Sequence, residues 1–304
     1  MYTNLALDIG GTKIDVCTFD EEYNLLKHDT LQTQAYRIRR LEFAEDVKSI
    51  IRSYITRDTT KLGVSWNCSM NQGVILWSSL LGGSVNYPLV KELTSEFEIP
   101  VKADDDIHAM TEAELRFGEG KELEHFMLLN IGTGIGAGYV EGKVIRGASN
   151  LAGIYCFHQM YVEEFSQFIA IENLVSGRGI QEIYTRFTGV EKSAKEILEI
   201  SNSEEAASET VAIFSKYLGK HLVDLTFFYN PSVIILNGSI AKSHHQFLPQ
   251  AMEYYHREME KLGRGMHDPR VPDLPPEHGI DWPGSLEHVV VSNLDYAACL
   301  GVLY

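Results

Sequence analysis

Glycines gather at two short turns whose chemistry suits a phosphate group. Gly10 and Gly11 follow the apolar run LALDI, and Gly132, Gly134 and Gly136 follow the apolar run FMLLNI. Glycine tolerates positive φ and lets main-chain N–H groups approach an anion closely. Ordinary hairpins would account for one such turn taken alone. Because the turn recurs, we favour two turns that hold the β- and γ-phosphates of a nucleotide.

The second turn also matches the loose dinucleotide-binding pattern, through GTGIGA at residues 132–137. That pattern requires a helix after the glycines, because the helix N-terminus receives the pyrophosphate. Gly136 and Gly138 are poor helix residues, and residues 139–145 read as two strands around a turn. The context therefore excludes a Rossmann site. The sequence also has no GxxxxGK[ST] motif, which excludes a P-loop.

The elements that must position these turns are strands followed by helices. LALDIGGTKIDVC and LLNIGTGIGAGYV share one plan. Each has an apolar strand, then Asp or Asn, then Ile-Gly, a turn and a second strand. This repeated plan predicts a duplicated fold of two lobes with a cleft between the copies. Further strands are expected at residues 61–65 and 233–236, and helices at 41–55, 90–97, 104–117, 169–184, 209–228 and 297–303.

The composition limits the class of protein. A chain of 304 residues is longer than one compact core usually serves. A net charge of −16 opposes nucleic acid as a partner. The four cysteines are far apart and predict reduced thiols rather than a disulfide scaffold. No leader or long apolar segment is evident, so we expect no membrane span and a cytoplasmic location. Residues 266–284 hold five of the nine prolines and predict an extended loop.

Several segments, in this order, resemble the ROK family of bacterial sugar kinases, which lies within the actin, hexokinase and Hsp70 superfamily. They are DIGGTK from residue 8, IPVKADDDIHAMTEAELRFGEG from 99, IGTGIG from 131, AIENLVSGRG from 170 and NPSVIILNGSIA from 230. The resemblance implies an α/β fold: a two-lobed, actin-like ATPase of ribonuclease-H-like topology with a duplicated βββαβα core. We expect an N-terminal lobe of residues 1–117, on which residues 294–304 pack, and a C-terminal lobe of residues 118–293.

The resemblance also assigns roles by position. Asp106 would be the base that takes the proton from the attacking sugar hydroxyl, and Asp8 would orient Mg²⁺ through water. The phosphates of ATP would be held by Gly10, Gly11, Thr12, Lys13, Gly132, Thr133 and Gly134. Gly238 and Ser239 would lie near the adenosine, and Asp105, His158 and Glu172 would contact the sugar.

Physical chemistry agrees with these roles and leaves alternatives. Phosphoryl transfer has a loose transition state, so a weakly basic carboxylate suffices as general base. The three acids at 104–106 also suit a helix cap and a solvated first turn, and one of them is expected to be only a cap. Lys13 is almost as well explained as an exposed strand lysine.

The sequence departs from the family pattern near the sugar. The usual glutamate is Ile154, and the family histidine aligns with His158 only if one residue is inserted. The cysteine cluster of the family's structural zinc is absent, and only Cys156 and His158 lie near, so we expect no structural zinc. The sugar loop at residues 78–88 is also altered. We therefore hypothesise a substituted acceptor, such as a glycoside or an N-acetyl sugar.

These features predict an ATP-dependent sugar kinase that transfers the γ-phosphate to a hexose or hexose derivative, at its 6-hydroxyl. We expect a homodimer. One alternative is a catalytically silent sugar-binding protein, which the altered sugar loop favours and which Asp106 and both turns oppose. Another is a regulator of the same family. Such regulators carry a DNA-binding extension before the first strand, and that strand begins here by residue 5.

Overall fold

The computed structural model describes residues 2–148, 150–265 and 288–304, and the proline-rich segment 266–284 lies outside them. Contacts divide the chain into two compact units. Unit 1 comprises Met1–Glu124, Gly138–Gly153 and Asn293–Tyr304. Unit 2 comprises His125–Ala137 and Ile154–Ser292. The lobe boundaries expected at residues 117 and 293 stay a prediction.

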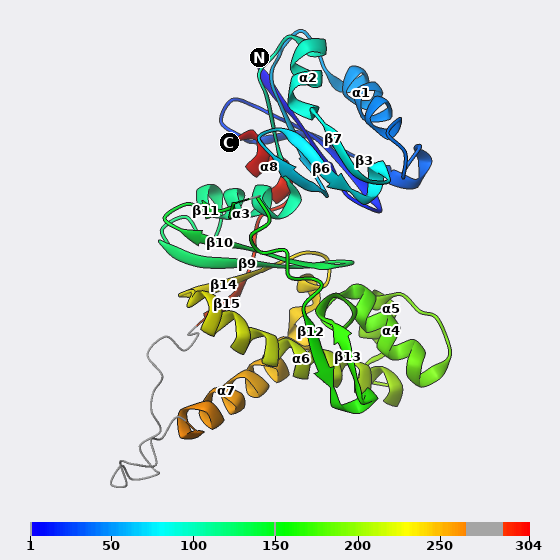
Figure 1. The fold of residues 1–304 in the computed structure, drawn as a ribbon, viewed down its shortest axis with the longest axis vertical. Coiled ribbons are helices and arrows are strands. Elements are labelled where there is room, and N and C mark those ends of the chain that lie inside the picture. The colour runs from blue at the N-terminus through cyan, green and yellow to red at the C-terminus, as the bar shows by residue number, and fades with distance from the viewer. Residues whose placement is uncertain (1, 149, 266–287) are drawn as a thin grey trace. The chain divides into compact units, whose positions relative to one another are not determined.

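A five-stranded sheet forms the centre of unit 1 (Figure 1). Its order is β3 (Leu25–Gln32), β2 (Lys13–Phe19), β1 (Thr3–Ile9), β4 (Thr59–Trp66) and β8 (Val101–Asp105). The first three strands pair antiparallel, and β1, β4 and β8 run parallel. β1 and β4 consist largely of consecutive buried residues, as expected for strands covered on both faces.

The other elements of unit 1 cover this sheet or extend it. They are α1 (Phe43–Tyr54), α2 (Leu89–Phe97), α3 (Asp106–Phe117), α8 (Ala297–Leu303), the 3₁₀ turns η1 (Thr33–Ala35) and η2 (Ser79–Leu81), and a small sheet of β5 (Ser69–Asn71), β6 (Val74–Ser78) and β7 (Gly83–Tyr87). α8 packs closely on α3, since a Cβ at Gly301 would collide with the carbonyl oxygen of Ala109. Lys61 Nζ also donates to the carbonyl oxygen of Leu303 in α8.

A second five-stranded sheet repeats the order of the first. Its strands are β11 (Val144–Ile145), β10 (Ile135–Glu141), β9 (His125–Ile131), β14 (Val233–Asn237) and β15 (His288–Val291). Here too β9, β14 and β15 are parallel, and β10 and β11 form a hairpin. Numbered within each copy, both sheets read 3-2-1-4-5, which is the expected duplication.

Helices dominate unit 2 outside the strands that it contributes to this sheet. They are α4 (Gly177–Thr188), α5 (Ala194–Ile200), α6 (Glu205–Tyr229) and α7 (Leu248–Gly265), with 3₁₀ turns η3 (Glu163–Phe165), η4 (Ile171–Asn173) and η5 (Ala241–Gln246) and a hairpin of β12 (Gln159–Val162) and β13 (Gln167–Ala170). α6 and α7 approach closely at Gly219, where a Cβ would meet the carbonyl oxygen of Ala251. None of the described helices combines the length and the apolar character that a membrane span needs.

Two sequence expectations were wrong about where a helix begins. The helix expected from residue 104 begins at Asp106, because Asp104 and Asp105 end strand β8. A single helix was expected over residues 169–184, but Ile169 and Ala170 end strand β13 and residues 171–173 form a 3₁₀ turn. The helix begins at Gly177, after Ser176, whose hydroxyl accepts a hydrogen bond from the N–H of Gly179 over 3.1 Å. A serine N-cap starts a new helix here because it satisfies a free N–H of the first turn.

Candidate active site

A row of polar residues crosses the sheet of unit 1 at one register position. Asp15 pairs with Thr30 on one side and Asp8 on the other, and Ser65 lies between Asp8 and Asp104. Residues paired in register point to the same face of a sheet. Thr30 Oγ1 donates to Asp15 Oδ1 and Ser65 Oγ donates to Asp8 Oδ1, each over 2.7 Å. The sheet thus places three carboxylates on one face.

Asp8 is the carboxylate of this row that suits a cation. Burial, followed by the negative charge of Asp106, raises the pKa of its carboxyl to about 7, although the Ser65 hydrogen bond opposes the shift. A divalent cation would relieve the repulsion between the two carboxylates, and oxygen ligands are those that Mg²⁺ prefers. The residues present therefore fit the Mg²⁺ position that the family resemblance implies for Asp8, and that position stays a prediction.

Asp106 is the first residue of α3 and is held by two hydrogen bonds. Asn67 Nδ2 donates to Asp106 Oδ2 over 3.0 Å, and the N–H of Ile107 donates to Asp106 Oδ1 over 3.1 Å. Burial raises the pKa of Asp106 to about 6, although the Asn67 hydrogen bond lowers it. At neutral pH most of this carboxylate is ionised, which a general base requires.

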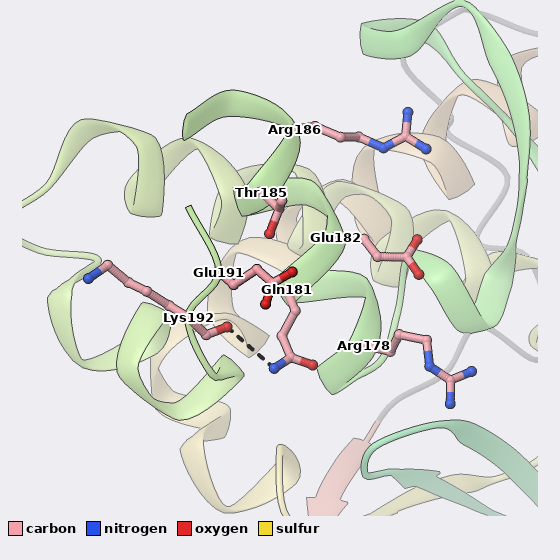
Figure 2. A pocket seen from close by; sticks show the side chains of 7 residues that line it. All are labelled: Arg178, Gln181, Glu182, Thr185, Arg186, Glu191 and Lys192. Atoms are coloured by element: carbon pink, nitrogen blue, oxygen red, sulfur yellow. Dashed lines mark hydrogen bonds between the residues drawn. The ribbon is translucent and has the colours of Figure 1, made fainter. Parts of the chain in front are cut away.

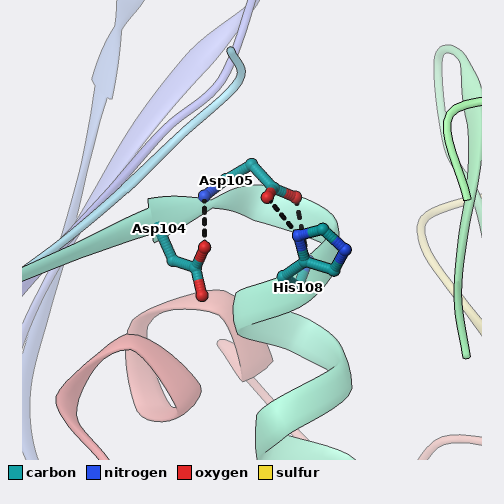
Figure 3. Close-up of side chains that lie close together, drawn as sticks. All are labelled: Asp104, Asp105 and His108. Atoms are coloured by element: carbon teal, nitrogen blue, oxygen red, sulfur yellow. Dashed lines mark hydrogen bonds and ion pairs between the residues drawn. The ribbon is translucent and has the colours of Figure 1, made fainter. Parts of the chain in front are cut away.

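The two aspartates before Asp106 have partners within the chain. Asp104 forms an ion pair with Arg146, with 2.6 Å between Asp104 Oδ2 and Arg146 Nη1. Asp105 is the N-cap of α3: its Oδ1 accepts from the N–H of His108 over 3.0 Å and its Oδ2 from Asn150 Nδ2 over 3.1 Å. It also bonds the His108 ring, as Figure 3 shows. Asp105 is the cap that the sequence anticipated, and its contact with a sugar stays a prediction.

Asp104, Asp105 and His108 are also the only described residues whose side chains could jointly surround a metal ion (Figure 3). Each of the two carboxylates already has a partner, and Arg146 brings a permanent positive charge to the group. A metal ion would have to displace that charge. We therefore assign the group a structural role. The expected lack of structural zinc stays a prediction.

The first glycine turn is anchored by the segment after β3. The N–H of Gly10 donates to the Lys13 carbonyl over 3.0 Å. Thr33 holds the turn twice, through its N–H to the Thr12 carbonyl over 3.0 Å and its Oγ1 to the Gly10 carbonyl over 2.8 Å. A Cβ at Gly11 would meet no described atom within 4 Å, and its φ is not positive. The protein's own packing does not require glycine there, which leaves room for a ligand.

The second glycine turn is anchored by the start of α4. The N–H of Gly132 donates to the Gly134 carbonyl over 3.0 Å. From α4, the N–H of Gly177 donates to the Gly132 carbonyl over 2.8 Å, and that of Arg178 to the Thr133 carbonyl over 3.1 Å. As in the first turn, a Cβ at Gly132 would meet no described atom within 4 Å, and its φ is not positive.

The turn expected near the adenosine lies beside the second glycine turn. Gly238 follows β14 with a φ of 99°, which favours glycine. A Cβ there would collide with the Ile131 carbonyl oxygen, and that oxygen accepts from the N–H of Ile240 over 3.0 Å. Ile131 directly precedes Gly132, so the two turns are neighbours within unit 2. Ser239 is exposed.

Two residues expected to contact the sugar also lie together in unit 2. A Cβ at Gly134 would be 2.5 Å from Glu172 Oε2, so this carboxylate rests against the second turn. Its Oε1 accepts from Arg178 Nη1 over 2.7 Å. His158 is held nearby by the main chain, because the N–H of Ile171 donates to the His158 carbonyl over 2.7 Å. The His158 side chain is exposed.

Sequence reasoning missed two residues of these groups, Asn67 and Arg178. Asn67 directly follows β4, at the carboxyl end of a parallel strand, where ligand-binding side chains tend to gather, and this position was a usable signal. Arg178 stands in the first turn of α4 and had no comparable signal. Lys13, expected on phosphate, is paired with Asp15, with 2.5 Å between Lys13 Nζ and Asp15 Oδ2.

A cavity of about 530 Å³ runs along α4 (Figure 2). Its lining residues are Arg178, Gln181, Glu182, Thr185, Arg186, Glu191 and Lys192. Figure 2 shows Glu182 between the two arginines on the same side of the helix. Because Arg178 also donates its N–H to the second glycine turn, this cavity begins where that turn is anchored.

Solved structures define the class of fold. A ROK family glucokinase from Streptomyces griseus, solved with glucose and AMPPNP, has a TM-score of 0.77 and 19% identity, covering 99% of this chain and 98% of its own. A ROK family transcriptional regulator, a homologue of the E. coli MLC protein, has a TM-score of 0.76 and 17% identity, covering 99% of this chain and 76% of its own. The predicted α/β, actin-like ATPase fold is therefore confirmed.

Sequence comparison then identifies the family. The ROK family model matches residues 4–263, and the chain belongs to the ROK family. An N-acetyl-D-glucosamine kinase from Aliivibrio salmonicida is 26% identical over 256 residues, which cover 78% of this chain and 84% of that protein. The predicted family is confirmed, and the predicted class of enzyme, a carbohydrate kinase, is the class of this relative.

Proposed function

We propose that this ROK protein is an ATP-dependent carbohydrate kinase that transfers the γ-phosphate of ATP to the 6-hydroxyl of a hexose or hexose derivative. The observation that carries the proposal is the carboxylate of Asp106. It stands at the first residue of α3, its pKa is about 6, and Asn67 fixes one of its oxygens. A carboxylate so placed can accept a proton at neutral pH.

In the proposed reaction each group of the chain has one task. Asp106 accepts the proton of the attacking hydroxyl on a carboxylate oxygen, and Asn67 orients that carboxylate. Main-chain N–H groups of the turns at Gly11 and Gly132 bind the phosphates, where no side chain obstructs them. Asp8 would hold Mg²⁺, which neutralises charge on the phosphate oxygens when it is bound with the nucleotide.

We further propose that the acceptor carries a substituent, as an N-acetyl sugar does. Ile154 stands where the family places a glutamate, and its side chain is 42% exposed. An apolar side chain there offers contact surface in place of a hydrogen bond. The name of the curated relative, an N-acetyl-D-glucosamine kinase, supports this class of acceptor. The homodimer and the cytoplasmic location stay predictions.

The test is ADP release with Mg·ATP across hexoses, N-acetyl hexosamines and β-glucosides, for the wild type and Asp106→Asn. We expect Asp106→Asn to bind Mg·AMPPNP normally while its turnover falls by a factor of about 10² or more. Glu112→Gln, a neutralised carboxylate on the same helix that pairs with Arg116, is the control and should retain activity. Undiminished turnover in Asp106→Asn would refute the base. Absence of sugar-dependent ADP release in the wild type would favour the silent alternative.

A further inference from the structure

Glu172 and Arg178 form an ion pair against the second glycine turn. Glu172 Oε1 and Arg178 Nη1 are 2.7 Å apart, and Glu172 Oε2 would lie 2.5 Å from a Cβ at Gly134. Arg178 is itself bound to the turn, because its N–H donates to the Thr133 carbonyl. A negative carboxylate and its cation therefore both border the N–H groups that we assign to phosphate.

A phosphate group at this turn would change the electrostatic balance of the pair. The carboxylate of Glu172 would repel the incoming anion, whereas the guanidinium of Arg178 would attract it. A guanidinium group binds a phosphate as readily as it binds a carboxylate, in each case through two parallel N–H donors. Both side chains are partly exposed, at 49% for Arg178 and 27% for Glu172, so the pair is accessible and inexpensive to separate.

We propose that Arg178 is a phosphate ligand of the nucleotide and that it leaves Glu172 when the nucleotide binds. This inference rests on the proposed kinase function and adds a residue that the family resemblance did not assign. Separation from Arg178 frees the carboxylate of Glu172 to accept a hydrogen bond from a sugar hydroxyl. The ligand that binds first bears the cost of breaking the ion pair, and the second ligand does not. Nucleotide and sugar should therefore strengthen each other's binding.

The size of both effects follows from the exposure of the pair. A hydrogen bond from a charged group to phosphate is typically worth a factor of about 10 or more in affinity. Breaking an exposed ion pair changes an equilibrium by a factor of at most about five. We therefore expect a roughly tenfold direct effect of Arg178 and a mutual enhancement by nucleotide and sugar of no more than about fivefold.

The experiment is titration calorimetry with Mg·AMPPNP, with and without N-acetyl-D-glucosamine. Arg178→Met should weaken nucleotide binding about tenfold, and Glu172→Gln should strengthen it by up to about fivefold and abolish enhancement by the sugar. Arg186→Met, which removes a second arginine of α4 from the same cavity, is the matched control and should bind nucleotide as the wild type does. Arg178→Lys serves if the methionine variant does not fold, and should show a smaller loss.

The opposite signs of the two variants separate this proposal from a purely structural pair. If the pair only braced the turn, both variants would weaken binding alike, and that result would overturn the proposal. Arg178→Met binding within twofold of the wild type would also overturn it. A wild type that does not bind Mg·AMPPNP would instead refute the kinase function, and this inference with it.

Discussion

Replacing Gly132 by alanine should separate nucleotide binding from stability. The structure gives no internal reason for glycine at this position, because its φ is not positive and a Cβ would meet no described atom within 4 Å. An alanine can adopt the native backbone, and it restricts the unfolded chain more than glycine does. The fold should therefore accept the methyl group, whereas a phosphate held by the turn should not.

The two expected effects have opposite signs. Gly→Ala at a compatible position raises the free energy of unfolding by about 0.4–1 kcal/mol, which corresponds to roughly 0.5–2 °C in Tm for a chain of this size. If the methyl group displaces one phosphate oxygen from its N–H donor, the lost charge-assisted hydrogen bond weakens nucleotide binding by about 1.5–3 kcal/mol. That is a loss of roughly 10- to 150-fold in affinity.

Thermal unfolding without ligand and calorimetry with Mg·AMPPNP measure the two quantities on the same samples. Gly189→Ala is the reverse control: Gly189 follows α4 with a φ of 68° and lies against no described atom, so alanine there should lower Tm and leave binding intact. If Gly132→Ala lowers Tm, or if it binds nucleotide as tightly as the wild type, our assignment of this turn to phosphate is refuted.

Two further predictions concern the carboxylates of unit 1. Asn67→Ala removes a hydrogen-bond donor that lowers the pKa of Asp106, which is about 6 in the wild type. The acidic limb of the kcat/KM profile should therefore move to higher pH by about one unit. A limb that does not move in the pH–rate profile contradicts this prediction. Asp8 has a folded-state pKa of about 7 against 3.8, so the stability it contributes is full below pH 3.8 and is lost as pH rises through 7. At about pH 8 the Asp8→Asn apoprotein should therefore have a higher Tm than the wild type. The gain in the free energy of unfolding should be roughly 1–2 kcal/mol, reduced for the partial exposure of Asp8. Equal melting curves would contradict this prediction.

The fold was accessible from the sequence where local pattern and tertiary structure agree. β1, β9 and β14 are apolar runs that end in glycine turns, and each was expected within about one or two residues of its observed bounds. The helix expected over 169–184 failed because Ile169 and Ile171 belong to a hairpin and a 3₁₀ turn. Their apolar character suits either structure, and only pairing with β12 decides between them.

The site was accessible only in part for a related reason. Glycine turns and an acidic helix start can be recognised in the sequence, because few other residue types suit the backbone conformations and free N–H groups found there. Asn67 is a site residue only because it contacts Asp106, which is 39 positions away in the sequence. Arg178 is one only because its N–H contacts the glycine turn that follows β9. Single polar residues carry no pattern, so contacts of this kind become visible only once the sheet brings the segments together.

The position of α8 has a consequence for how the chain matures during synthesis. A ribosome adds roughly 5–20 residues per second, and domains usually fold as they emerge, the first one first. Here Gly301 fits against α3, yet the ribosome must translate His125 through Ser292 before residues 293–304 appear. Unit 1 therefore waits, by this rate, roughly 10–30 s with the surface that receives α8 uncovered. During that interval the nascent chain exposes an apolar surface to which chaperones could bind.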